Sequence, residues 1–255
     1  MADSVAALVL AAGSGTRLRP LTSLRPKALC PVGNVALVDL ALERLVPVVC
    51  SGAGSVAVNA RHHLDQMQAH LDGRVHLSLE VGPHQLGTAG AVARLRPWLD
   101  GRPVVVVNAD AWHRIDLRRV LTGWDGARVR VLFAAGPNEQ FGPRSRIVAS
   151  VLPVQEVAAL PTEPSGLWEV CWHPRLEDGT LDAVPVAGLL IDCGTPADYL
   201  AANLAASGGA SVVGPGAVVE GELVRSVVWP EGVVRRGEVL VDSIRVGESL
   251  TVRAG

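Results

Sequence analysis

The chain alternates short apolar runs with longer segments in which apolar residues recur at helical spacing. Strands are predicted at 5–10, 56–59, 75–80 and 104–108, and helices at 37–46, 62–71, 88–99 and 117–123. Further strands are predicted at 128–134, 147–152 and 184–191, and a last helix at 196–207 begins with Thr195 as its N-cap. This order is typical of βαβ units and predicts an α/β fold, a Rossmann-like mixed sheet flanked by helices.

The pattern changes from residue 212 onward, where Val or Ile recurs at about six-residue intervals and Gly or Pro stands near the corners. This periodicity predicts a short C-terminal left-handed β-helix of about two coils, with an irregular hairpin-rich tail as the alternative. So small a unit needs a neighbour to cover it, either the preceding domain or a second copy. The predicted domains are 1–208 and 209–255.

Composition excludes several classes of protein. With 255 residues, 49% hydrophobic content and a net charge of −2, the chain can form a sizeable core but has no broad basic face for nucleic acid. The first apolar run breaks at Gly13 and is too short to span a membrane, so we expect a cytoplasmic protein with no membrane partner. Four irregularly spaced cysteines are expected to be free thiols: Cys30, Cys50, Cys171 and Cys193.

A glycine-rich turn follows the first strand and carries the candidate chemistry. Lys27 is the only lysine among 23 Lys and Arg residues, and a compact ammonium suits a phosphate contact. Pro20 and Pro26 can turn the chain so that Lys27 returns to the loop, with Arg17 at its edge. The sequence therefore predicts an anion cradle with two cations, whose backbone N–H groups come from Gly13, Ser14, Gly15 and Thr16.

Two common phosphate-binding classes do not fit this turn. Leu18 replaces the third glycine of the dinucleotide fingerprint, and Asn59 stands where the acidic residue of that fold would end the next strand. The G-x-x-x-x-G-K-[ST] motif of P-loop NTPases is absent from the sequence.

The segment AAGSGTRLRPLTSLRPKALCPV at 11–32 resembles the signature of the sugar-1-phosphate nucleotidyltransferases. The resemblance extends to LVDLALERL at 37–45, HQLGTAGAV at 84–92, VVNAD at 106–110 and DCGTPADYLAAN at 192–203. With the hexapeptide tail, it is closest to the mannose-1-phosphate guanylyltransferase-like branch. It implies that 1–208 is the catalytic domain.

The resemblance implies a reaction in which a sugar 1-phosphate attacks a nucleoside triphosphate and pyrophosphate leaves. Arg17 and Lys27 would act on the departing phosphates, and Asp110 and Asp192 would bind Mg²⁺. The implied nucleotide-binding residues are Leu10, Ala11, Ala12, Gly13, Ser14, Gly15, Thr16, Gln85, Gly87 and Thr88. For Thr88, a role in capping the following helix is the alternative.

The sugar side departs from the family pattern. Many relatives carry a Glu-Lys-Pro segment whose lysine reaches the sugar phosphate, and this chain lacks it; Arg144 or Arg146 could substitute. The expected substrates are GTP and mannose 1-phosphate, and a homo-oligomer is possible. The alternatives are a UTP- or dTTP-dependent enzyme and a catalytically silent nucleotide-sugar-sensing subunit.

Overall fold

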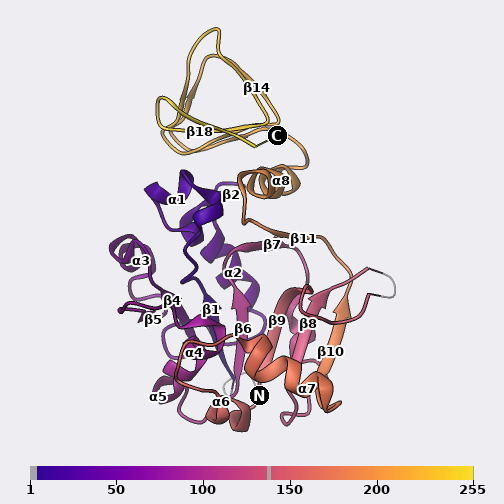
Figure 1. The fold of residues 1–255 in the computed structure, drawn as a ribbon. Helices are drawn as coiled ribbons and strands as arrows, with labels where there is room; N and C mark the ends of the chain where they lie inside the picture. Colours follow the sequence, from indigo (N-terminus) through magenta and orange to yellow (C-terminus); the bar gives the residue numbers. More distant parts are fainter. Residues whose placement is uncertain (1–4, 137–138, 255) are drawn as a thin grey trace. The chain divides into compact units, whose positions relative to one another are not determined.

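A computed structural model describes residues 5–136 and 139–254 and contains a mixed seven-stranded sheet in the order β10-β8-β9-β6-β1-β4-β5 (Figure 1). The chain divides into two compact units, one formed by residues 1–13, 41–109 and 113–190 and the other by 14–40, 110–112 and 191–255. The sheet belongs to the first unit. Its strands are β1 (Ala6–Leu10), β4 (Val56–Ala60), β5 (His76–Leu79), β6 (Val104–Asn108), β8 (Arg130–Ala134), β9 (Arg146–Leu152) and β10 (Asp182–Val186).

The order of these strands places a switch point beside β1. The chain runs from β1 outward through β4 and β5, then returns to the other side of β1 with β6, and all four strands are parallel. β9 then pairs antiparallel with both β6 and β8, which makes the sheet mixed. In open α/β sheets, ligands bind beyond the carboxyl ends of strands at such a point, here the ends of β1 and β6.

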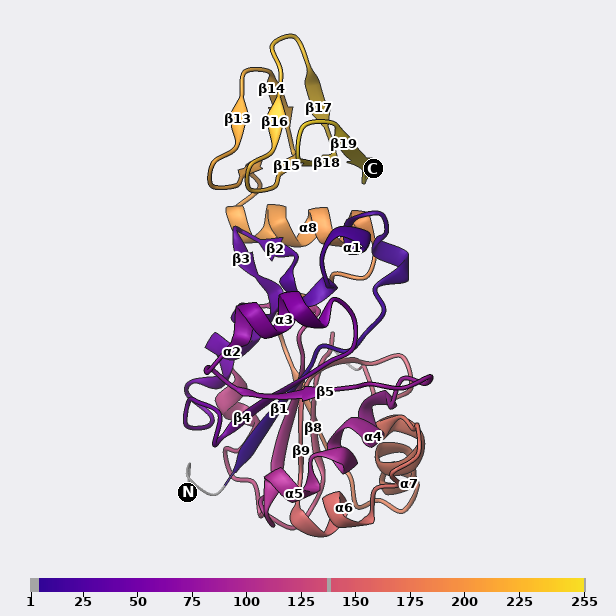
Figure 2. The ribbon, with the colours of Figure 1, turned by 90° about the vertical axis from the view of Figure 1, so that its left-hand side faces the viewer.

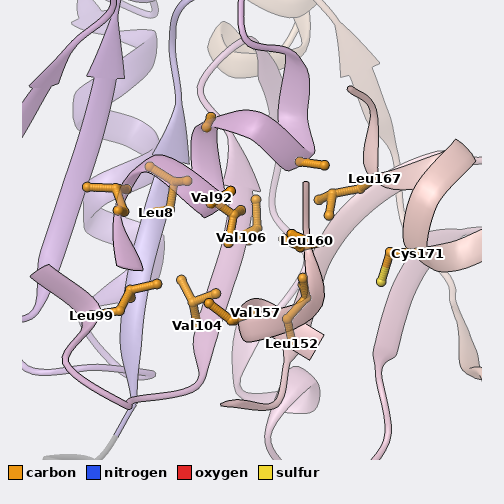
Figure 3. Packing of buried hydrophobic residues seen from close by; sticks show 14 of the residues in the cluster. Leu8, Val92, Leu99, Val104, Val106, Leu152, Val157, Leu160, Leu167 and Cys171 are labelled. Atoms are coloured by element: carbon orange, nitrogen blue, oxygen red, sulfur yellow. The ribbon is translucent and has the colours of Figure 1, made fainter. Parts of the chain in front are cut away.

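One face of the sheet carries the main hydrophobic core of the first unit. Leu8, Val104 and Val106 point to the same face because alternate residues of a strand do so, and Val92 and Leu99 pack on them (Figure 3). The elements flanking the sheet are α3 (Leu64–Leu71), α4 (Gly87–Arg94), α5 (Arg96–Leu99), η4 (Leu117–Val120), α6 (Val154–Ala159), the π-helical η5 (Trp168–Trp172) and α7 (His173–Glu177).

Three predicted elements differ from the structure. The predicted helix 88–99 is two helices, because Pro97 cannot donate a backbone hydrogen bond and α4 ends before it. The predicted helix 117–123 is the short 3₁₀ helix η4. The predicted strand 184–191 is interrupted at Gly188, whose φ of 147° is open mainly to glycine, and it forms parts of β10 and β11 (Leu190–Asp192).

The second unit joins the glycine-rich segment to the C-terminal part of the chain. It contains η2 (Thr16–Leu18), α1 (Leu21–Leu24), η3 (Lys27–Leu29), β2 (Pro31–Val32), β3 (Val35–Ala36) and α8 (Pro196–Ser207). Three elements have residues in both units: α2 (Leu37–Leu45), β7 (Ala111–His113) and β11, which pairs with β7. The predicted cap of α8 is confirmed, since Thr195 Oγ1 accepts a hydrogen bond from the Asp198 N–H at 3.2 Å.

The C-terminal strands form the predicted β-helix (Figure 2). Its three sides are the parallel pairings β12-β15-β18, β13-β16 and β14-β17, and β19 closes the end antiparallel to β18. The strands are β12 (Val212–Val213), β13 (Val218–Val219), β14 (Glu222–Val224), β15 (Val227–Val228), β16 (Val233–Val234), β17 (Val239–Val241), β18 (Ser243–Val246) and β19 (Leu250–Arg253). The fold class predicted from the sequence is thus confirmed; the domain boundary after residue 208 stays a proposal.

The β-helix packs on α8 within the second unit, and α8 in turn contacts β2. Trp229 is fully buried, and its Nε1–H donates to the Tyr199 hydroxyl at 3.0 Å. Tyr199 in turn donates to the carbonyl oxygen of Pro31. The Arg25 guanidinium lies 4.4 Å from the centre of the Trp229 ring. A continuous core therefore connects the tail with the segment that carries Lys27.

Within the described residues, no helix is long and apolar enough to cross a membrane. None of the four cysteines forms a disulfide within the part of the chain that the structure describes.

Candidate active site

Lys27 lies between two carboxylates that come from distant parts of the sequence. Its Nζ is 2.7 Å from Oδ2 of Asp110 and 3.3 Å from Oδ1 of Asp192. Lys27 begins η3, Asp110 follows the end of β6, and Asp192 ends β11. All three residues belong to the second unit, so its fold alone brings these predicted site residues together.

The ammonium of Lys27 is well enclosed, whereas its partners are open. Its side chain is 10% exposed, against 41% for Asp110 and 55% for Asp192. Burial alone would lower the pKa of Lys27, but the charges and hydrogen bonds of both carboxylates outweigh it and raise that pKa. The lysine therefore stays charged at neutral pH, and the exposed carboxylate oxygens can reach a ligand.

Backbone hydrogen bonds hold the main chain at Asp110 and at Asp192. The Cys193 N–H donates to the Asp110 carbonyl at 2.9 Å, and the Gly194 N–H donates to the Asp192 carbonyl at 2.7 Å. A Cβ atom on Gly194 would lie 2.9 Å from Nη2 of Arg17, so the guanidinium passes close to this glycine. Arg17, predicted as the second cation, thus lies beside the glycine two residues after Asp192.

The glycine-rich loop is shaped at Gly15. Its φ of 60° favours glycine, and a Cβ atom there would lie 2.8 Å from Cγ2 of Thr22. The Thr22 hydroxyl donates to the Gly15 carbonyl at 2.8 Å, which ties the loop to α1. Of the other predicted loop residues, Ala12 is buried, Ala11 is half-buried, and Gly13, Ser14 and Thr16 are exposed and accessible to a ligand.

The first unit contains a separate polar network that supports the predicted base-binding segment. The carboxylate of buried Glu80 accepts from Asn59 Nδ2 at 2.7 Å and from the Leu86 N–H at 3.2 Å. Asn59 Oδ1 accepts from the Ala11 N–H at 2.7 Å. This network connects the ends of β1, β4 and β5. Glu80 was not predicted from the sequence, although polar residues that end consecutive strands are a detectable signal.

The residues predicted to contact the base have different neighbours. Gln85 Nε2 lies 3.4 Å from the carbonyl oxygen of Ala12, so it connects the segment before α4 with the loop after β1. Gly87 packs against the backbone of Ser165, where a Cβ atom would collide at 2.3 Å. The Thr88 hydroxyl accepts from the Leu167 N–H at 2.7 Å, so it ties α4 to the segment before η5.

A cavity of about 290 Å³ lies in the first unit at the carboxyl ends of β1 and β6. Leu10 and Thr88, which were predicted to bind the nucleotide, line this cavity, whereas its other lining residues were not predicted. The lining residues are Leu10, Thr88, Val106, Asn108, Ile147, Ser150, Gly166, Leu167, Trp168, Glu169 and Trp172.

Two further side chains of the first unit, His113 and Arg146, have structural contacts. His113 is buried, its Nδ1 accepts from the Ile115 N–H at 3.2 Å, and burial together with the charge of Arg44 lowers its pKa to about 3. Arg146, a candidate for the missing sugar-phosphate lysine, donates from Nη1 to the Leu190 carbonyl at 3.1 Å.

An α/β sheet with a glycine-rich loop after its first strand is typical of proteins that bind phosphorylated ligands. In this chain a lysine shared by two carboxylates follows that loop. Residues 6–141 match the family described as Nucleotidyl transferase, which is more than half of the chain, and the chain belongs to this family.

Comparison with known proteins agrees with this assignment. The N-acetylmuramate alpha-1-phosphate uridylyltransferase of Caulobacter vibrioides is 36% identical over 148 residues, which cover 53% of this chain and 60% of that protein. The mannose-1-phosphate guanylyltransferase of Mycobacterium tuberculosis is 30% identical over 121 residues, 46% of this chain and 33% of that protein. The chain thus matches between a third and three fifths of these two relatives.

The fold is shared with solved structures over nearly the whole chain. A mannose-1-phosphate geranyltransferase from Thermus thermophilus has a TM-score of 0.67 and 20% identity, and the match covers 98% of this chain and 95% of that chain.

Proposed function

We propose that this protein is a sugar-1-phosphate nucleotidyltransferase. In this reaction a phosphate oxygen of the sugar 1-phosphate forms a bond to the α-phosphorus of a nucleoside triphosphate. The bond from that phosphorus to the bridging oxygen breaks, and pyrophosphate leaves with the electron pair. The observation that carries the proposal is the Lys27 ammonium held by Asp110 and Asp192 in a member of the nucleotidyl transferase family.

Arg17 and Lys27 have the positions and charge to hold phosphate oxygens. Lys27 is a compact point charge that remains protonated, and Arg17 offers an exposed planar fork beside Gly194. Both would neutralise the charge that develops on the departing pyrophosphate, and they would orient it for in-line displacement.

The donor set of the cluster fits Mg²⁺. Asp110 and Asp192 offer exposed carboxylate oxygens and already converge on one positive charge. The described residues form no cluster of three or more His, Cys, Asp or Glu side chains that could enclose a metal, which suits a cation that keeps water and substrate oxygens. When bound, Mg²⁺ would add positive charge beside the phosphates.

The finer proposal is GTP with mannose 1-phosphate, supported by the hexapeptide tail and the Gly87–Ala91 segment. UTP or dTTP is the second candidate, because the 36% identical relative is a uridylyltransferase. A catalytically silent sensor is less favoured, since Arg17, Lys27, Asp110 and Asp192 are all present and assembled.

A pyrophosphate-release assay over a matrix of triphosphates and sugar 1-phosphates, with saturating Mg²⁺, tests the proposal. We expect one triphosphate to exceed the others by at least about tenfold in kcat/KM, roughly 1.4 kcal/mol. Absence of release from every pair, in protein shown to be folded, would refute the activity and leave the sensor.

Gln85→Ala tests the base-binding part separately. We expect this variant to reduce the ratio of kcat/KM between the preferred triphosphate and the others more than it reduces kcat/KM for the preferred one. The reason is that a mismatched base would no longer leave the polar groups of Gln85 buried and unpaired. Glu163→Gln, an exposed polar change in the same unit, is the control. Equal selectivity in both variants would exclude Gln85 from base recognition.

A further inference from the structure

The segment DCGTPADYLAAN at 192–203 contains two polar side chains that have no part in the proposed reaction. Asp192 begins this segment, and Tyr199 and Asn203 lie further along it on α8. Both are fully buried, and because they are four residues apart they lie on the same face of the helix. Buried polar side chains are hydrogen-bonded in the great majority of cases, so their partners show what they hold.

Tyr199 and Asn203 both bind the main chain at β2, which lies against α8 (Figure 2). The Tyr199 hydroxyl donates to the Pro31 carbonyl, and Asn203 Nδ2 donates to the same oxygen at 3.4 Å. Asn203 Oδ1 accepts from the Gly33 N–H at 3.0 Å. One helix face therefore holds the backbone of β2 and of the turn that follows it.

The neighbours of these side chains give the anchor a single arrangement. Trp229 Nε1 lies 3.0 Å from the Tyr199 hydroxyl, and an indole N–H can only donate. The hydroxyl must accept that hydrogen bond, which leaves its one proton for Pro31. A Cβ atom on Gly33 would lie 3.3 Å from Cβ of Ala206 on α8, so the turn after β2 also packs closely on the helix.

The anchored backbone belongs to the same short segment as Lys27. η3 begins at Lys27, and the Cys30 N–H donates to the Lys27 carbonyl at 3.0 Å. Pro31 follows Cys30 directly, so one hydrogen-bonded turn separates Lys27 from the carbonyl that α8 holds. A displacement of Pro31 would therefore be transmitted to the backbone of Lys27.

The same segment supplies one of the two carboxylates that bind the ammonium. Asp192 Oδ1 lies 3.3 Å from Lys27 Nζ, and Thr195, three residues later, is the N-cap of α8. The segment 192–203 thus contacts the Lys27 side chain at its beginning and the Lys27 backbone segment at its end. Such control is relevant to catalysis, because a misplacement of about 1 Å can cost about 100-fold in rate.

We propose that Tyr199 and Asn203 are positioning residues, which hold the Lys27 ammonium against its carboxylates by binding the backbone at Pro31 and Gly33. The proposal rests on the proposed function for treating Lys27 as a site residue. It goes beyond that function by giving α8 a part in the reaction, although neither side chain is proposed to touch a substrate. A purely stabilising role would instead leave the environment of Lys27 and the value of kcat unchanged.

NMR of the only lysine tests the position of Lys27 without turnover. Full-length protein labelled with ¹⁵N at lysine Nζ has one such side-chain signal. We expect this signal to shift by more than its line width in Tyr199→Phe and in Asn203→Ala, at neutral pH without metal or substrate. Ser226→Ala is the matched control, because Ser226 is fully buried in the same unit and its hydroxyl binds the Leu240 carbonyl at 3.0 Å. The control should leave the signal in place.

Steady-state kinetics with the preferred substrate pair supplies the second measurement. We expect Tyr199→Phe to lower kcat about tenfold and to change the KM for the triphosphate by less than about twofold. The reason is that Lys27 would act mainly on the charge that develops on the departing pyrophosphate. Ser226→Ala should lower Tm, because it too loses a buried hydrogen bond, but it should leave kcat unchanged.

The outcomes separate the inference from the proposed function. An unchanged Nζ signal in the folded variants, or a shifted signal with unchanged kcat, would overturn the inference alone. An equal shift in Ser226→Ala would also overturn it, since general loss of stability would then explain the effect. Asn203→Ala decides if Tyr199→Phe does not fold, and loss of the fold in both would assign the two residues to stability alone. A shifted signal in a protein that turns over no substrate pair would support the inference and refute the proposed activity.

Discussion

Lys27 Nζ lies 2.7 Å from Asp110 Oδ2, although the two residues are 83 positions apart in the sequence. Asp192, 165 positions from Lys27, joins them at 3.3 Å. Three segments of the second unit thus meet at one ammonium. Because that ammonium is the only one among the side chains of this protein, its charge can be removed or replaced without a nearby lysine to compensate.

Asp110→Asn and Asp192→Asn should each lower turnover by orders of magnitude at saturating Mg²⁺ and leave the fold intact. Each change removes a charged oxygen ligand that is substantially exposed, not a core contact. Steady-state pyrophosphate release and Tm measure the two effects. Asp116→Asn, an exposed aspartate paired with Arg118, is the matched control. Near-wild-type turnover in either site variant would contradict the metal assignment.

Lys27→Arg should be harmful although the charge is kept, because a guanidinium is wider than an ammonium and the side chain is 10% exposed. Lys27→Met should also slow turnover, yet it should bind Mg²⁺ about tenfold more tightly, since the two carboxylates lose their internal cation. Calorimetric titration with Mg²⁺ measures this. Unchanged metal affinity in Lys27→Met would show that the carboxylates do not bind the metal together.

Sequence periodicity located the elements well where no special residue intervenes. The predicted strand 104–108 and helix 196–207 match β6 and α8 to the residue. Prediction was wrong where a single residue breaks a regular pattern, as Pro97 does for the helix after Thr88 and Gly188 does for the strand before Asp192. Periodicity records which face is apolar, but it does not record where a backbone hydrogen bond is lost.

Part of the candidate site could likewise be predicted from the sequence, and part could not. Lys27, Asp110 and Asp192 were proposed from motifs, and the structure brings them together; their roles stay proposals. The cavity with Ser150 and Trp172 was not predictable, because a lone serine inside an apolar strand and a tryptophan in an irregular segment match no motif. Which residues line the cavity depends on how segments far apart in the sequence meet, and only the folded structure shows that.

Removing residues 212–255 should lower thermal stability or change assembly more than it alters the chemical step. Trp229 packs against Tyr199 inside the core of the second unit, so loss of the tail exposes apolar surface there. Trp229→Ala should lower the free energy of unfolding by about 3–5 kcal/mol, because it removes a large buried side chain. Trp229→Phe should lower it by about 1 kcal/mol, because it loses mainly the hydrogen bond to Tyr199. Denaturant unfolding measures both. A stable but inactive truncation would instead place the tail at the active site.

His113 should make the protein less stable below pH 6.5. Burial lowers its pKa from the ordinary 6.5 of an unfolded chain to about 3 in the folded state, so the unfolded chain binds more protons in that window. The contribution of His113 to the free energy of unfolding is therefore fully present above pH 6.5. It falls by up to about 1.4 kcal/mol per pH unit as the pH decreases toward 3. His113→Asn, whose Oδ1 can still accept from Ile115, should flatten the pH dependence of unfolding between about pH 6.5 and 5. An unchanged slope would show that other groups dominate.

Glu80→Gln should weaken nucleotide binding indirectly. Glu80 holds the segment before α4 in place and is not itself proposed to contact the nucleotide. Its two oxygens accept from Asn59 Nδ2 and the Leu86 N–H, so an amide nitrogen in either place would face another donor in a buried setting. The expected loss of stability is about 1–3 kcal/mol, together with a higher KM for the triphosphate and a smaller change in kcat. Glu80→Asp keeps both acceptors and should recover part of the nucleotide affinity, whereas the isosteric amide should not. If both variants raised the KM for the triphosphate equally, side-chain length and not hydrogen bonding would position the segment before α4. If neither variant raised this KM, that segment would play no part in binding the nucleotide.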